Sequence, residues 1–129
     1  MSGELRNRTV LVAFESERVR STLTAGFNDE GELVLEGYDI GAFVEEVWGD
    51  SDYEYWLTVR GADLPRLAGV LAAARGEPEP AEADREKWIV ATLKALFAPE
   101  AAPLHFRNDS EFKKWMDAHA IPSHFFSWP

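Results

Sequence analysis

The three histidines are the residues of this chain with the most versatile chemistry, since imidazole binds metal ions and transfers protons near neutral pH. They are His105, His119 and His124, and the last two stand five apart across a turn that contains Pro122. Two imidazoles at this spacing could share one metal ion, with Asp117 as a third ligand. The helical zinc motif, in which two histidines four residues apart accompany a glutamate, is absent. The histidines therefore carry only the alternative hypothesis, a small-molecule or metal-binding domain.

The acidic run at residues 50–54 begins like a calcium-binding loop but departs from that pattern. Its sixth position is Tyr55, where the loop needs glycine, and its twelfth is Gly61, where the loop needs a bidentate glutamate. The chain has no serine-nucleophile motif and no phosphate-binding glycine motif. Because it also has no cysteine, thiolate chemistry and disulfides are excluded. We therefore expect no catalytic residues, no cofactor and no enzymatic activity.

Acidic residues are concentrated between Arg20 and Arg60, where ten carboxylates occur without a single lysine or arginine. The rest of the chain has as many acids as bases, so this segment carries the whole net charge of −10. Such a field repels nucleic acid and anionic membranes and attracts a basic protein. The alternative interpretation is a solvated face whose charge only keeps the protein soluble.

Large rings alternate with carboxylates in the second half of this segment. Rings bury area and stack on arginine, while carboxylates pair with arginine and lysine, so the combination suits docking of a basic partner. Glu45 and Glu46 fall in the last turn of an expected helix, where the helix dipole disfavours anions. If the tyrosines of the following strand face the core, Trp56 and Glu54 face the other way; alternatively, all the rings belong to the core. The predicted partner-binding residues are Glu45, Glu46, Trp48, Asp50, Asp52, Glu54 and Trp56.

Hydropathy patterns predict the elements that position these residues. Alternation and short apolar runs predict strands, and apolar spacing of three and four predicts helices. The expected strands are 9–14, 19–27, 32–38, 53–60 and 123–128, with a tight turn at 28–31. The expected helices are 40–47 with Asp39 as N-cap, 64–74, 84–97, and one that begins at a capping box over 108–111. We predict a single α+β domain over residues 1–129, an antiparallel β-meander with about four helices packed mainly on one face, and a flexible loop at about 76–83.

Composition also constrains location and assembly. No apolar run has the length of a membrane span, and no apolar stretch follows a basic start as in a secretory signal. We expect a cytoplasmic protein that binds neither nucleic acid nor membrane, and the excess of arginine over lysine suggests a bacterial source. Because an exposed sheet face or the strand at 125–128 could pair with a second copy, monomer and homodimer both stay open.

Two stretches of the chain resemble a family of small uncharacterised bacterial proteins. The first covers residues 36–41 (Glu-Gly-Tyr-Asp-Ile-Gly) and 48–56 (Trp-Gly-Asp-Ser-Asp-Tyr-Glu-Tyr-Trp), and the second covers the close of the chain from Phe112 to Trp128. In general character the chain looks like bacterial immunity proteins, which are small, acidic, cytosolic α+β domains that neutralise a basic toxin. The resemblance implies no catalytic residues. The acidic segment and its rings predict a non-enzymatic domain that docks a basic partner, and the resemblance adds the immunity- or antitoxin-like form of that function. A homo-oligomeric structural protein is a further alternative.

Overall fold

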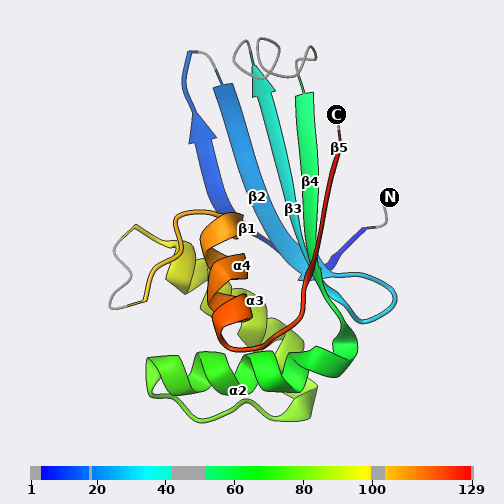
Figure 1. Ribbon diagram of the computed structural model, residues 1–129, viewed down its shortest axis with the longest axis vertical. Coiled ribbons are helices and arrows are strands. Elements are labelled where there is room, and N and C mark those ends of the chain that lie inside the picture. Colours follow the sequence, from blue (N-terminus) through cyan, green and yellow to red (C-terminus); the bar gives the residue numbers. More distant parts are fainter. Residues whose placement is uncertain (1–3, 18, 42–51, 100–103, 129) are drawn as a thin grey trace.

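The strands form one open antiparallel sheet. The computed structural model describes residues 4–17, 19–41, 52–99 and 104–128. Five strands lie side by side in the order in which they occur in the sequence, β1-β2-β3-β4-β5 (Figure 1). Their bounds are β1 Arg6–Glu15, β2 Val19–Phe27, β3 Leu33–Gly41, β4 Asp52–Val59 and β5 His124–Trp128. The predicted meander is confirmed, and the C-terminal strand joins it by pairing with β4.

Three α-helices accompany the sheet in the described part of the chain, so the prediction of about four is wrong. They are α2 Leu64–Arg75, α3 Arg85–Phe97 and α4 Asp109–Ala118, and the short 3₁₀ turns η1 Gly61–Asp63 and η2 Glu82–Asp84 precede α2 and α3. None of the described helices combines the length and the apolar character needed to span a membrane. The mixed α+β character of the prediction is confirmed.

The beginning of the predicted helix at 40–47 is a strand. Asp39, Ile40 and Gly41 complete β3, where they pair with Ser21, Arg20 and Val19 of β2. This pairing satisfies the backbone hydrogen-bonding groups of the segment, and that tertiary gain outweighs the helical spacing of its apolar residues. The remainder of the predicted helix lies outside the described residues.

The hydrophobic core lies between the helices and one face of the sheet. Every second residue of β2, β3 and β4 turns toward the helices, as period-2 alternation requires. Leu57 and Val59 on β4, for example, are fully buried. In Figure 1 the helices gather against the lower part of the sheet, and the upper ends of β1 to β4 project beyond them. The strand residues of the core are Leu11, Leu23, Ala25, Phe27, Leu33, Leu35, Leu57 and Val59, and the principal helical ones are Leu67, Leu71, Ile89, Leu93, Phe112 and Met116.

Local signals in the sequence begin and end the helices. The Asn108 side chain accepts a hydrogen bond of 3.0 Å from the Glu111 backbone N–H, so the predicted cap of α4 is confirmed. Gly76 ends α2 in the left-handed region, with φ of 65°. Gly31 takes φ of 75° in the turn between β2 and β3, a conformation that favours glycine.

The face of the sheet turned away from the helices is called the outer face here. Its lower part is covered by the N-terminal segment, where Leu5 lies against Gly26 so closely that no side chain fits on that glycine. Val34, which neighbours Gly26 in the sheet, is accordingly buried. On β5 the outer face is exposed along the whole strand, and on β4 it is half-buried.

Candidate functional site

The structure places two of the predicted partner-binding residues in full. Glu54 and Trp56 lie on β4 and point to the outer face, since Leu57 and Val59, of opposite parity, are buried in the core. The predicted alternation of this strand is confirmed. Asp52 is described only as the first residue of β4, and Glu45, Glu46, Trp48 and Asp50 lie outside the described residues.

Trp56 is the centre of a side-chain cluster that spans three strands. Strand register places Glu36 of β3 on one side of it and Phe126 of β5 on the other. The indole Nε1 donates a hydrogen bond of 3.1 Å to the Glu36 carboxylate. The indole ring stacks on the Phe126 ring, with 5.6 Å between centroids and 29° between planes. The Trp56 ring is thus fixed on both sides and half-buried.

Trp128 and Glu54 extend this cluster along the outer face, where they are paired across β5 and β4. Trp128 is 63% exposed and Phe126 is 51% exposed, which is high for rings of this size. We call the five residues the outer aromatic surface: Glu36, Glu54, Trp56, Phe126 and Trp128. Its two carboxylates lie in the part of the sequence that contains no lysine or arginine. The surface combines exposed rings with negative charge, so it can stack on and pair with cationic side chains.

Three members of the outer aromatic surface were not predicted. Glu36, Phe126 and Trp128 are distant from Trp56 in sequence, and only the register of β3, β4 and β5 brings them together. The alternation of residues 123–128 contained a usable signal, because it puts Phe126 and Trp128 on one face. Whether they lie on the same face of the sheet as Trp56 depends on which strand β5 pairs with and in which register. The sequence alone specifies neither.

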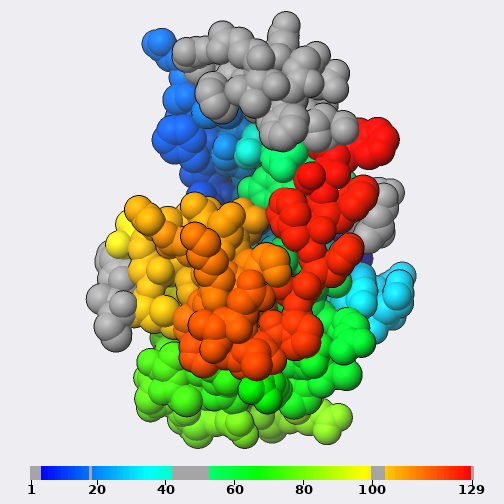
Figure 2. Space-filling view, viewed as in Figure 1, coloured from blue at the N-terminus to red at the C-terminus, as the bar shows by residue number. Residues whose placement is uncertain are grey.

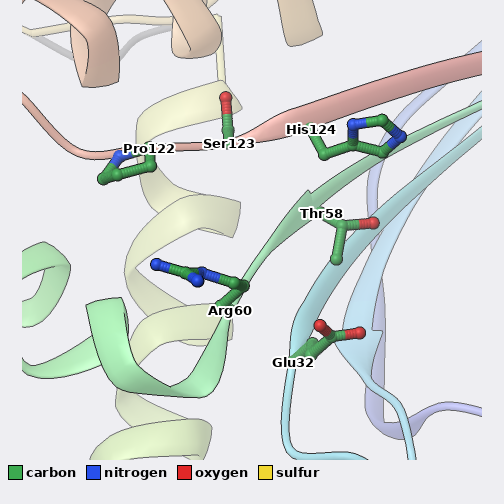
Figure 3. Close-up of a pocket in the computed structure, with 6 residues that line it drawn as sticks. All are labelled: Glu32, Thr58, Arg60, Pro122, Ser123 and His124. Carbon is green, nitrogen blue, oxygen red and sulfur yellow. The ribbon is translucent and has the colours of Figure 1, made fainter.

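A pocket of about 430 Å³ lies at the lower end of β4 and β5 (Figure 3). Thr58 and His124, which are paired across the two strands, line it together with Arg60 and Glu32. The Glu32 carboxylate accepts a hydrogen bond of 2.8 Å from the Asn28 side chain. Since His124 has the same parity as Phe126 and Trp128, this pocket continues the outer aromatic surface toward the helices.

A second cleft, of about 260 Å³, lies on the helix-facing side, where the sheet extends past the N-terminus of α4. Its polar lining includes Asp39, Asp109 and Tyr55. Burial raises the pKa of Asp39, and the Ser21 hydroxyl partly offsets that rise. Burial also raises the pKa of Asp109, the neighbouring charge of Asp39 adds to the rise, and backbone N–H groups at the start of α4 oppose it. The pKa of Tyr55 is raised by burial and then by the two carboxylates, so its hydroxyl stays protonated.

The histidines do not come together as the alternative hypothesis requires. Within the described ranges, which include His105, His119 and His124, no three metal-ligating side chains form a group that could hold an ion. His119 lies at the end of α4, where its Nδ1 is 2.8 Å from the Trp115 carbonyl oxygen and its ring packs on the Trp115 ring. His124 belongs to β5 instead. These contacts give His119 a local structural role.

Comparisons with known proteins return no relative. No family model, curated protein or solved structure matches the chain. The resemblance to small bacterial proteins of immunity-like character therefore stays a prediction.

Proposed function

We propose that this chain is a non-enzymatic protein-binding domain that docks a basic protein through the outer aromatic surface. The observation that carries the proposal is the exposure of Trp128 and Phe126 beside the half-buried Trp56 and two carboxylates. Soluble domains seldom leave adjacent large rings in water unless a partner covers them. Tryptophan is also among the residues that contribute most to protein–protein affinity.

The preferred partner is basic because of the charge around these rings. Glu36 and Glu54 flank Trp56 on the neighbouring positions of the sheet, and the chain as a whole carries a net charge of −10. An arginine of the partner could stack on a ring and pair with a carboxylate at once. The same field would accelerate the encounter with a basic protein and repel nucleic acid. An immunity- or antitoxin-like role, in which the domain neutralises a basic toxin, is the form of this function that we favour.

The geometry of Trp56 supports docking over simple solvation. Its indole N–H is held by Glu36 and its ring by Phe126, so the ring is ordered before any partner arrives. A surface that is already rigid loses little conformational entropy on binding. Charge placed only for solubility would require neither the stacked pair nor the exposed Trp128.

The proposal is tested by affinity capture from a lysate of the source organism, followed by measurement of the purified complex. We compare the wild-type chain with the variants Trp128→Ala and Glu54→Lys. The control is Glu82→Lys, which makes the same charge reversal at an exposed position of η2. Circular dichroism verifies that all three variants fold.

We expect a captured protein with a basic isoelectric point. Trp128→Ala should weaken its binding by about tenfold or more, as for a ring at an interface. Glu54→Lys should slow association and reduce the salt dependence of the affinity, whereas Glu82→Lys should change both much less. If Trp128→Ala and Glu54→Lys bind as tightly as the control, the outer aromatic surface is not the docking site.

A further inference from the structure

Strand β5 is an open edge of the sheet. It pairs with β4 on one side, and no strand of the described chain pairs with the other. All five of its residues are exposed. Figure 2 shows them as a continuous red band at the surface beside α4. The outward backbone groups of β5 are consequently available to another strand.

The opposite edge of the sheet is protected by devices that β5 lacks. Strand β1 contains two bulges, one between Arg6 and Thr9 and one between Val10 and Val12. Helix α3 lies against β1, and the Lys94 ammonium donates to the Val10 carbonyl oxygen at 3.4 Å. Bulges and lysine side chains are two of the means by which proteins prevent edge strands from pairing with other chains.

Strand β5 instead has the features of a pairing edge. Its register with β4 is regular from Thr58↔His124 to Glu54↔Trp128, so it has no bulge. Its sequence, His-Phe-Phe-Ser-Trp, contains no proline, lysine, arginine or carboxylate. On the core-facing side, Phe125 stacks on Tyr55 with 6.1 Å between ring centroids, which anchors the strand to the sheet. Lys113 of α4 donates to the Ser123 hydroxyl at 3.0 Å, just before the strand begins. The edge formed by β5 itself is regular in register and carries no charged side chain.

We propose that the basic partner binds by adding an extended strand to β5, with arginine or lysine at every second position. This inference rests on the proposed function and specifies how that docking is achieved. An added strand continues the sheet, so alternate side chains fall on the outer face beside Phe126 and Trp128. The added strand lies two strand spacings, about 9.6 Å, from β4, which carries Glu54. Opposite charges attract over that distance, which is within the Debye length of ~10 Å at 0.1 M salt.

Charge complementarity distinguishes this occupant from a second copy of the chain. A second β5 would bring no lysine or arginine to the edge, and its chain would add another net charge of −10. A basic strand brings positive charge toward Glu54 and can also stack on the exposed rings of Phe126 and Trp128. The side chains between its basic residues would face Phe125, so apolar residues are expected there.

The test uses synthetic peptides as stand-ins for the partner strand. The principal probe is a ten-residue peptide that alternates arginine with valine, and the control alternates glutamate with valine. Two further versions of the basic peptide are N-methylated, one at every arginine and one at every valine. N-methylation removes backbone donors without changing side-chain charge, and a strand directs only one of these two sets of N–H groups toward β5.

Affinities for the full chain are measured by calorimetry, and amide hydrogen exchange is measured for β5. We expect the basic peptide to bind, the acidic peptide not to bind, and only one of the N-methylated versions to lose affinity, by about tenfold or more. Amides of β5 should exchange more slowly in the complex. Trp128→Ala and Glu54→Lys should lower the affinity of the chain for the basic peptide, and Glu82→Lys should not.

The outcomes separate this inference from the proposed function. If both N-methylated peptides bind the wild-type chain with the affinity of the unmethylated peptide, and Glu54→Lys lowers the affinity for all of them, docking occurs through side chains alone. Strand addition is then overturned. If Glu54→Lys and Trp128→Ala also leave the affinity unchanged, the proposed function fails as well. Absence of any binding by the basic peptide counts against the inference. A dimer in sedimentation analysis whose β5 amides are already protected from exchange without the peptide would show that the edge belongs to a second copy, and would overturn the inference.

Discussion

Replacing Gly37 with alanine should destabilise the fold by displacing a ring that supports β5. Gly37 lies on β3 between Leu23 and Tyr55, and the Tyr55 ring covers it so closely that a Cβ atom there would overlap three ring carbons. The ring cannot simply retreat, because it also stacks on Phe125 and packs against Tyr53. Overpacking of this kind costs about 1–3 kcal/mol.

Part of this cost is offset by the ordinary benefit of removing a glycine. Alanine in place of a strand glycine gains about 0.5–1 kcal/mol, mainly from the lower entropy of the unfolded chain. Because the Cβ would overlap three ring carbons, the cost falls in the upper part of that range, about 2–3 kcal/mol. The net expectation for Gly37→Ala is therefore a loss of about 1–2.5 kcal/mol in the free energy of unfolding. Because Tyr55 holds Phe125, β5 should also exchange its amide hydrogens faster in this variant.

Urea unfolding followed by tryptophan fluorescence provides the measurement, with Gly69→Ala as the matched control. A Cβ on Gly69, within α2, would meet only the carboxylate of Glu79, the end of a flexible side chain that can move aside. The control should thus gain about 0.5–1 kcal/mol from helix propensity. In combination with Tyr55→Ala, the Gly37 substitution should lose most of its effect. If Gly37→Ala is neutral or stabilising, or if its effect adds to that of Tyr55→Ala, the packing argument is refuted.

Two further predictions concern the start of α4 and the cleft beside it. Asn108→Ala removes the side chain that accepts a hydrogen bond from the Glu111 backbone N–H. In urea titrations it should lower the free energy of unfolding by about 1 kcal/mol. Unchanged stability would mean that solvent replaces the cap. At a pH above the raised pKa of Asp39, the wild-type carboxylate is ionised in a half-buried site, so Asp39→Asn should stabilise the fold. The gain should be only about a few tenths of a kcal/mol, because solvent screens the charge. Since the folded state holds the Asp39 proton more tightly than the unfolded state, the gain should vanish when stability is measured at about pH 3. A gain of equal size at both pH values would contradict this origin.

The strands were predictable where one face is buried and the other is not. Residues 19–27 alternate in the sequence, and β2 has those bounds. The helix expected from Ile40 was wrong at its beginning because spacing measures only a local preference. The pairing of Ile40 with Arg20 on one side and Asp52 on the other is a tertiary contact, which no local pattern contains.

The candidate site was predictable only one strand at a time. Alternation along β4 assigned Trp56 and Glu54 to the outer face, because the sequence itself shows which residues of that strand are apolar. The Glu36 carboxylate and the Phe126 ring lie on other strands, and a shift of one residue in either register would turn them to the opposite face. The pKa of Asp109 likewise depends on how α4 is placed above the sheet, which the sequence does not indicate.

The unequal edges of the sheet also limit the size of any assembly built by sheet extension. Continuous growth, as in a fibril, needs two compatible edges on each subunit, so that every addition recreates an acceptor. Here β1 is bulged and bound by Lys94, and β5 is the edge that remains open in the described chain. Two copies of this domain joined through β5 would end in the protected β1 on both sides, so the domain does not act as a template for its own polymerisation.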